Sequence, residues 1–230
     1  MVDGLQQTVK ASTSRSGPGA RENQHMTLAI IGAGNVGRAL ATSATRAGYD
    51  VVVASTDPED AQAVADATGA RVAASNRQAA AAAGIVVLAV PYPALETLIT
   101  DLAVTLRGKV VIDVTNRPIQ AGPSIAEALQ ARLPESHVVK AFNTVFASRQ
   151  ADPIVDGVQA DAFVAGDDAD AKAAVLALAK AIGFRAIDAG GLDVAGTLEG
   201  MAWLNISLNM QNGWVWQDAW KLVGPTSAAA

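Results

Sequence analysis

Residues 28–40 read LAIIGAGNVGRAL, in which a short apolar run is followed by a glycine-rich turn and by alanine-rich helical spacing. The turn matches the GxGxxG arrangement of dinucleotide-binding folds, which lies between a strand and a helix. Gly32 permits the tight turn, Gly34 lets the backbone approach a pyrophosphate, and Gly37 allows close helix packing. The following helix presents N–H groups and a partial positive charge to phosphate. This context favours dinucleotide binding over a glycine turn that binds nothing.

Strand-like and helix-like segments alternate along most of the chain after residue 26. The expected strands are 27–32, 50–54, 70–73, 84–90, 109–115 and 137–142. The expected helices are 35–47, 58–68, 76–83, 93–106 and 123–132. A strand at 162–166, a helix near 168–182 and a strand at 184–188 are expected to extend the same sheet. Such alternation, with continuous apolar runs, predicts an α/β fold with a doubly wound, mostly parallel Rossmann sheet.

The composition limits the chemistry that this chain can perform. Its 230 residues include no cysteine and two histidines, so we expect neither a disulfide framework nor a metal site. The formal net charge of −5 argues against nucleic-acid binding, and no apolar run is long enough to span a membrane. We therefore expect a cytoplasmic protein whose substrate is a small molecule.

Three regions of the chain differ in composition. Residues 1–25 are polar and are expected to be a disordered arm, and residues 26–190 are expected to form the Rossmann domain. Residues 191–230 begin with helical spacing and contain all four tryptophans, which are more often core or dimer contacts than cofactor walls. We expect residues 191–230 to form a small helical C-terminal lobe that completes the reaction pocket and contributes to a homodimer.

Neutral hydroxyl residues follow the second expected strand. An NAD-specific site usually has Asp or Glu at this place, whereas Ser55 and Thr56 accept a 2′-phosphate without repulsion. This favours NADP over NAD, and Arg71 or Arg77 could reach the phosphate. Asp57 is either a displaced ribose ligand or the cap of the next helix.

Further candidates follow the next strands, because ligands of open α/β sheets bind at the carboxyl ends of the strands. Val90 and Pro91 come after the fourth strand and are expected to line the cofactor. Thr115 and Asn116 come after the fifth strand, where a hydroxyl and an amide can meet a carboxamide or a ribose. At both places the alternative is a plain turn beside proline.

The polar pair Asn143 and Thr144 follows the sixth strand and is placed to face a nicotinamide. Lys140 is a possible general acid, but its alternation with apolar positions favours a solvated side chain. Hydride transfer between two redox cofactors needs alignment and dry walls more than an acid–base residue. The shortage of catalytic histidine or tyrosine candidates fits such a reaction.

These motifs resemble those of the deazaflavin (coenzyme F-420)-dependent NADP oxidoreductases, over about residues 27–222. The resemblance rests on GAGNVGRAL at 32–40, AVP at 89–91, DVTN at 113–116, VVKAFNT at 138–144, GDDADAK at 166–172 and LDVAGTLEGMAWLNISL at 192–208. The FNT form is also similar to the NADPH-binding domain of metalloreductases. The family implies a Rossmann core, a small C-terminal lobe and a homodimer, with NADP and a deazaflavin bound side by side.

The resemblance also implies roles for individual residues. The pyrophosphate loop would comprise Gly32, Gly34, Asn35, Val36 and Gly37. Ser55 and Thr56 would hold the 2′-phosphate, although many family members carry arginine where Thr56 stands. The segment that faces the deazaflavin would comprise Asn143, Thr144 and Val145, with Asn143 and Thr144 as the catalytic pair.

Three hypotheses for the function follow. The first is an NADP-dependent oxidoreductase that exchanges a hydride with a deazaflavin coenzyme as its small-molecule redox co-substrate. The second is an NADPH-dependent reductase of flavin or of a small carbonyl or imine. The third is a non-catalytic module that senses NADP(H), which the tryptophan-rich C-terminal segment disfavours because pure nucleotide binding needs no further pocket walls.

Overall fold

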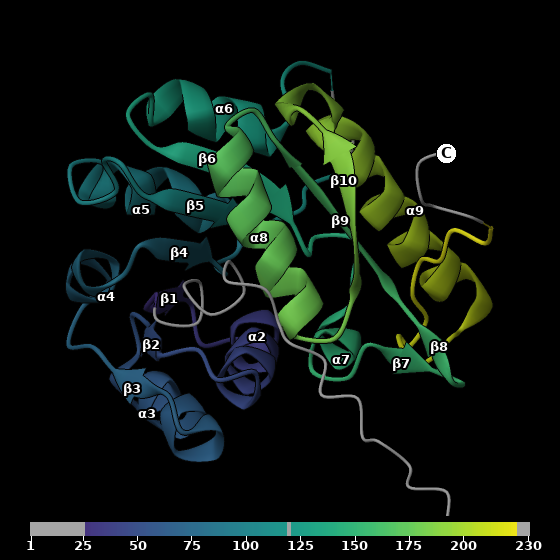
Figure 1. The fold of residues 1–230 in the computed structure, drawn as a ribbon, viewed down its shortest axis with the longest axis horizontal. Coiled ribbons are helices and arrows are strands. Elements are labelled where there is room, and N and C mark those ends of the chain that lie inside the picture. The colour runs from purple at the N-terminus through teal and green to yellow at the C-terminus, as the bar shows by residue number, and fades with distance from the viewer. Residues whose placement is uncertain (1–25, 119–120, 225–230) are drawn as a thin grey trace, which may run out of the picture.

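The computed structural model describes residues 26–118 and 121–224, so the arm expected at residues 1–25 lies outside the described residues. The described residues form one eight-stranded sheet with helices packed on both faces (Figure 1). Its strands are β1 (Leu28–Ile31), β2 (Val51–Ala54), β3 (Arg71–Val72), β4 (Ile85–Leu88), β5 (Val110–Asp113), β6 (His137–Ala141), β9 (Asp161–Gly166) and β10 (Arg185–Gly190). A separate hairpin, β7 (Ile154–Val155) and β8 (Val158–Gln159), was not expected from the sequence.

The strand order confirms the doubly wound, mostly parallel sheet. It reads β10-β9-β6-β5-β4-β1-β2-β3, and the pairs from β3 to β6 are all parallel. The winding reverses between β1 and β4, which is the place where such sheets open a crevice for ligands. β9 pairs antiparallel with β6 and β10 pairs parallel with β9, so these two strands extend the sheet in the opposite direction.

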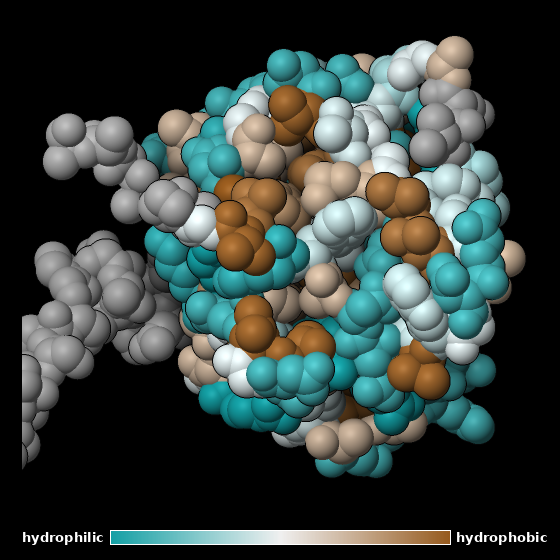
Figure 2. Space-filling model, turned by 90° about the vertical axis from the view of Figure 1, so that its right-hand side faces the viewer, coloured by the Kyte–Doolittle hydropathy of each residue, from teal (hydrophilic) through white to brown (hydrophobic). Residues whose placement is uncertain are grey.

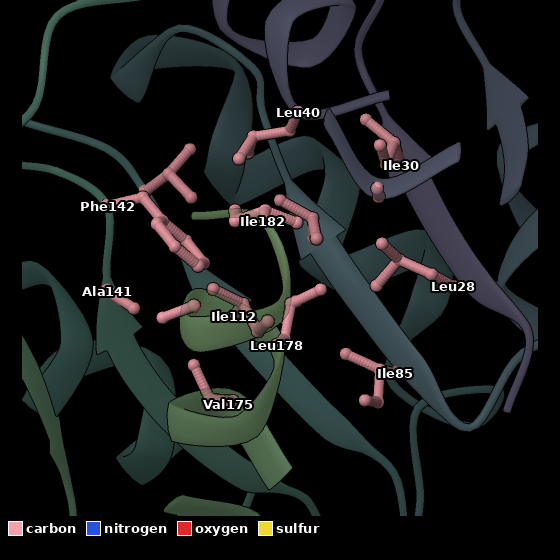
Figure 3. Close-up of a cluster of buried hydrophobic side chains, with 14 of the residues drawn as sticks. Leu28, Ile30, Leu40, Ile85, Ile112, Ala141, Phe142, Val175, Leu178 and Ile182 are labelled. Atoms are coloured by element: carbon pink, nitrogen blue, oxygen red, sulfur yellow. The ribbon is translucent and has the colours of Figure 1, made fainter. Parts of the chain in front are cut away.

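Helices cover both faces because alternate residues of each buried strand point to opposite sides. In β1, Leu28 and Ile30 join the core under α2 (Asn35–Arg46), α3 (Pro58–Thr68) and α8 (Ala169–Ala181), as Figure 3 shows in part. Ala29 and Ile31 face the other core, under α4 (Asn76–Ala82), α5 (Leu95–Leu102) and α6 (Ile125–Arg132). Two covered faces explain why the strand sequences are continuously apolar.

Caps and prolines decide where the helices begin. Asp57 accepts a hydrogen bond from the Glu59 N–H at 2.9 Å and caps α3, so the helix-cap interpretation of Asp57 is confirmed. α5 begins later than the expected residue 93, because residues Tyr92–Ala94 form a 3-10 turn that contains Pro93, and it ends at Leu102 instead of the expected residue 106.

The C-terminal segment contains one long helix, α9 (Ala195–Asn212), and an irregular stretch that returns to the sheet. Gly213 ends α9 in the left-handed conformation, with a φ of 64°. Leu198 of α9 packs with Phe163 of β9, and the half-buried Trp220 packs against the same group. Among the described residues, no helix has the length and apolar character needed to cross a bilayer.

Asp161 at the start of β9 holds the irregular stretch in place. Its buried carboxylate accepts two hydrogen bonds from Arg185, at 2.6 and 2.5 Å. It also accepts hydrogen bonds from the Lys221 Nζ at 3.1 Å and from the Leu222 N–H at 2.7 Å. Burial raises the pKa of Asp161, but the hydrogen bonds from Arg185, Leu222 and Lys221 outweigh it and keep that pKa below its ordinary value.

We therefore expect Asp161→Asn to lower the free energy of unfolding at pH 7 by about 2–3 kcal/mol, since the charged hydrogen bonds weaken. Because the folded-state pKa of Asp161 is depressed, its contribution is complete above the ordinary carboxyl range and is lost as the pH falls through the folded-state value. Urea unfolding between pH 7 and pH 3 should show a smaller acid loss in the variant. The exposed Asp156→Asn is the control, and an equal acid loss in both variants would contradict the prediction.

Candidate functional site

Three cavities follow one another along the carboxyl edge of the sheet. The Ser55 cavity, of about 210 Å³, lies between the glycine turn, Ser55 and Pro91. The Pro91 cavity, of about 330 Å³, shares Gly34 and Pro91 with it, and the Asn143 cavity, of about 130 Å³, shares Val36 and Asn116 with the Pro91 cavity. The shared residues place the three cavities in a row across the switch point, and we call this row the path.

This path brings together thirteen of the fourteen site residues expected from the sequence. They are Gly32, Gly34, Asn35, Val36, Ser55, Thr56, Val90, Pro91, Thr115, Asn116, Asn143, Thr144 and Val145. Gly37 does not line a cavity but lies under the turn, where a Cβ would come within 1.9 Å of the Gly32 carbonyl oxygen. The residues expected from the sequence therefore lie together along one edge of the sheet, although lining a cavity does not by itself assign a role.

The three glycines of the turn serve different purposes. Gly32 has a φ of +113°, and a Cβ there would lie 2.1 Å from the Ala89 carbonyl oxygen, so the fold itself requires glycine. At Gly34 a Cβ would meet nothing within 4 Å, and no side chain caps the α2 N-terminus that begins there. Gly34 therefore borders an open cradle beside uncapped helix N–H groups, which suits an anion.

Ser55 and Thr56 line the Ser55 cavity together with Gly34. Asn76, at the start of α4, lines the same cavity, and its Oδ1 atom is buried without a hydrogen-bond partner. Sequence reasoning missed Asn76, because it reads as the first residue of an alanine-rich helix. This end of the path offers hydroxyl and amide groups, and its described lining includes no cationic side chain.

The two arginines considered for a phosphate are engaged elsewhere. Arg71 makes a two-point ion pair with Asp50, at 3.0 and 2.7 Å. Arg77 forms an ion pair with Asp101. The suggestion that either arginine binds the 2′-phosphate is therefore not supported, because each guanidinium already forms an ion pair with a carboxylate of the protein.

Asn116 and Asn143 join the ends of β5 and β6. Asn116 Nδ2 donates to the Asn143 carbonyl oxygen at 2.8 Å, and Asn143 Nδ2 donates to Asn116 Oδ1 at 3.0 Å. Asn143 Nδ2 also donates to the Leu198 carbonyl oxygen of α9 at 3.0 Å. The Thr115 hydroxyl donates to Asp113 at 2.6 Å, so its proton is not directed to a ligand as the sequence suggested.

The expectation of a solvated Lys140 is wrong, because its side chain is completely buried. Its ammonium donates to Asp113 at 2.9 Å, to the Thr115 carbonyl oxygen at 2.6 Å and to Glu199 of α9 at 3.1 Å. We call Lys140, Asp113 and Glu199 the Lys140 cluster. Strand alternation predicts which face Lys140 is on, but α9 covers that face and supplies Glu199 as a partner.

The loop after β6 turns sharply to form the Asn143 cavity. Phe142 has a φ of 61°, a conformation uncommon outside glycine, and its buried ring packs against Phe184. Gln150, the last residue of the short helix α7 (Ala147–Gln150), donates from Nε2 to the carbonyl oxygens of Phe142 and Val145, at 3.1 and 3.0 Å. Gln150 lines the cavity but carried no recognisable signal in the sequence.

The strand order, the glycine turn at the switch point and the path of cavities define a Rossmann-type dinucleotide-binding protein. Residues 27–117 match the family described as NADP oxidoreductase coenzyme F420-dependent. The chain is 33% identical over 211 residues to the F420-dependent NADP reductase of Methanothermobacter marburgensis, which covers 81% of this chain and 94% of the relative. The chain belongs to this family of F420-dependent NADP reductases.

Two further similarities extend this result. The crystal structure of a putative F420-dependent NADP reductase from Arthrobacter sp. FB24 has a TM-score of 0.76 and 28% sequence identity, covering 84% of this chain and 98% of that one. Metalloreductase STEAP3 of Rattus norvegicus is 32% identical over 177 residues. That match covers 75% of this chain but 35% of the metalloreductase, so the likeness concerns one part of a longer protein.

Proposed function

We propose that the chain transfers a hydride between NADP(H) and the deazaflavin coenzyme F420. The observation that carries the proposal is the lining of the Asn143 cavity, where none of the described residues has a titratable side chain. Reduction of a carbonyl or an imine calls for a proton donor beside the substrate. Exchange between two redox cofactors calls for alignment in a dry pocket, which amide, hydroxyl and apolar side chains supply.

The residues along the path fit NADP. The open cradle at Gly34 and the uncapped start of α2 suit the pyrophosphate, while Ser55 and Thr56 suit the 2′-phosphate. When bound, NADPH supplies the hydride from its nicotinamide ring. The role of Asn143 and Thr144 in this proposal is to orient the reacting rings and keep water away, not to exchange protons.

The C-terminal segment completes the acceptor pocket in this proposal. Ala202 and Ile206 of α9 line the Asn143 cavity together with residues that follow β5 and β6. None of the four tryptophans lines that cavity in the described structure. Phe146 does line the cavity, and Trp216 packs edge-on against it with ring centroids 5.3 Å apart. Trp216 therefore contacts a cavity residue without lining the cavity itself.

The reaction is tested by anaerobic mixing of the protein with NADPH and oxidised F420, followed by the absorbance of both cofactors. Loss of F420 absorbance together with NADPH oxidation supports the proposal. NADPH oxidation with flavin, a carbonyl or an imine, and none with F420, would favour the second hypothesis. Tight NADPH binding without any turnover would favour a sensing module.

We also propose a homodimer formed through the C-terminal lobe. Large apolar side chains on this side are exposed, including Leu204, Met210, Trp214 and Val215. Figure 2 views the side that carries α9 and shows several hydrophobic groups between hydrophilic ones. Burying such groups against a second copy is favourable. Light scattering should give twice the 23.4 kDa mass of one chain, and Met210→Glu should shift the protein towards the monomer.

Thr56→Arg is expected to strengthen NADPH binding by about 1–2 kcal/mol, since a guanidinium adds charge-assisted hydrogen bonds to the 2′-phosphate. Thr56 is exposed at the mouth of the Ser55 cavity, so the larger side chain needs no repacking. Fluorescence titration with NADPH and NADH measures the effect, and NADH serves as the control because it lacks the phosphate. Equal gains for both dinucleotides, or tighter NADH binding by the unaltered protein, would contradict the assignment.

A further inference from the structure

Three buried oxygen atoms in the Asn143 cavity have no hydrogen-bond partner in the protein. They are Asn143 Oδ1, Thr144 Oγ1 and Gln150 Oε1, on residues that are 5%, 2% and 1% exposed. All three residues line the same cavity. A buried polar atom without a partner is destabilising, so three such atoms on residues that line one cavity indicate a missing ligand.

The hydrogen bonds of the two amides fix which atom of each is left without a partner. Asn143 Nδ2 donates to Leu198 O and Asn116 Oδ1, and Gln150 Nε2 donates to Phe142 O and Val145 O. A flipped amide would bring its oxygen against these oxygen atoms, which repel it. Asn143 Oδ1 and Gln150 Oε1 are therefore fixed acceptors, whereas the Thr144 hydroxyl can also donate.

The rest of the cavity restricts the ligand to a neutral one. The wall is otherwise largely apolar, with Val36, Val145 and Ile206 among its residues, and it includes no charged side chain among those described. Two acceptors and one hydroxyl match a group that has two N–H donors and one carbonyl oxygen, which is a primary carboxamide. The cavity shares Val36 and Asn116 with the Pro91 cavity, along the path assigned to the dinucleotide.

We propose that Gln150 and Asn143 bind the amide N–H groups of the nicotinamide carboxamide, and that Gln150 is thereby a specificity-determining residue. Thr144 donates to the carbonyl oxygen of the same carboxamide. The proposal rests on the proposed function, because it requires the dinucleotide to lie along the path. The pyrimidine ring of a deazaflavin carries an imide N–H of the same chemistry, so the test separates these two sources.

The test compares NADPH with its 3-acetylpyridine analogue, in which a methyl ketone replaces the carboxamide and both N–H donors are lost. Fluorescence titration of the unaltered protein should show about 10- to 100-fold weaker binding of the analogue. Gln150→Met should reduce this ratio towards one, because it removes an acceptor that only the carboxamide N–H groups can use. Thr144→Val should weaken the binding of both dinucleotides and leave the ratio unchanged, because both carry the carbonyl oxygen. Weaker binding by Thr144→Val reports a lost contact with the ligand, because the Thr144 hydroxyl has no hydrogen-bond partner in the protein to lose.

Gln130→Met is the matched control for Gln150→Met. Gln130 Nε2 likewise donates to two carbonyl oxygens, those of Leu133 and Ser136, but Gln130 lies on α6 and outside the cavity. The ratio should keep its original value in this variant. A general loss of folding would weaken the binding of both dinucleotides and leave their ratio unchanged, so a fall in the ratio reports the lost contact. A ratio that persists in a Gln150→Met protein with the circular dichroism of the unaltered protein overturns the proposal.

The remaining outcomes also decide between the sources. Equal affinity of the unaltered protein for NADPH and the analogue overturns the carboxamide assignment while leaving the proposed function intact. If a 5-deazaflavin then binds more tightly than its 3-methyl derivative, and Gln150→Met removes that difference, the acceptors bind the imide instead. Failure to bind NADPH at all would count against the proposed function itself.

Discussion

Lys140→Met is expected to lower the free energy of unfolding by about 3–5 kcal/mol, the usual cost of removing one partner from a buried ion pair. The substitution leaves the carboxylates of Asp113 and Glu199 without their cation, in a region where Lys140 and Asp113 are completely buried. The carbonyl oxygen of Thr115 loses its donor as well. Urea unfolding at pH 7 measures the change.

Two further variants test whether the expected loss of stability is electrostatic. Lys180→Met, on the exposed side of α8, should change stability by less than about 1 kcal/mol, as is usual for surface positions. The triple variant Lys140→Met, Asp113→Asn, Glu199→Gln should recover part of the loss, because it leaves no unpaired buried charge. A Lys140→Met protein as stable as the Lys180→Met control would contradict the electrostatic account of the Lys140 cluster.

The same cluster connects the sheet to the wall of the reaction pocket. Glu199 lies in α9, three residues before Ala202 of the Asn143 cavity, and it also accepts a hydrogen bond from the Ile125 N–H at 2.8 Å. Lys140 therefore fixes α9 relative to the ends of β5 and β6. In the proposed reaction Lys140 is a positioning residue, since it does not line any of the three cavities.

The parts of the fold that depend on local sequence could be predicted. Strands β1, β2, β4, β5 and β6 follow from apolar runs buried on both faces, and the glycine turn follows from steric demands within a few residues. The row of cavities along the sheet edge follows from the parallel strand order, because the carboxyl ends of parallel strands lie at the same edge of the sheet. Each of these inferences uses contacts between neighbouring βα units.

The features that were missed depend on tertiary contacts, either with distant segments or across a sharp turn. The burial of Lys140 requires Glu199, 59 residues further along the chain, to pack over β6. Gln150 became a cavity residue because the sharp turn at Phe142 brings α7 back beneath the loop. Asp161 holds Leu222 across 61 residues. Local periodicity cannot supply such partners, because the same residues in isolation read as surface positions or loops.

Gly34→Val is expected to weaken NADPH binding by at least about 100-fold, or about 2.8 kcal/mol, while the protein remains folded. Gly34 has a φ of −71° and a ψ of −171°, an extended conformation that valine adopts without strain. A Cβ at this position meets no protein atom within 4 Å, so a side chain here does not clash with the rest of the protein. The branched side chain instead fills the cradle that the pyrophosphate is proposed to occupy.

Gly32→Val provides the contrast, because the Cβ at that position would lie 2.1 Å from a carbonyl oxygen and the φ of +113° is strained for valine. It should disrupt folding, as seen by circular dichroism and urea unfolding, whereas Gly34→Val should unfold at nearly the same urea concentration as the unaltered protein. Gly34→Ala should weaken NADPH binding less than Gly34→Val, in proportion to the space that it fills. Full NADPH affinity in a folded Gly34→Val protein would falsify the placement of the pyrophosphate at this turn, because no other property of the structure requires glycine at position 34.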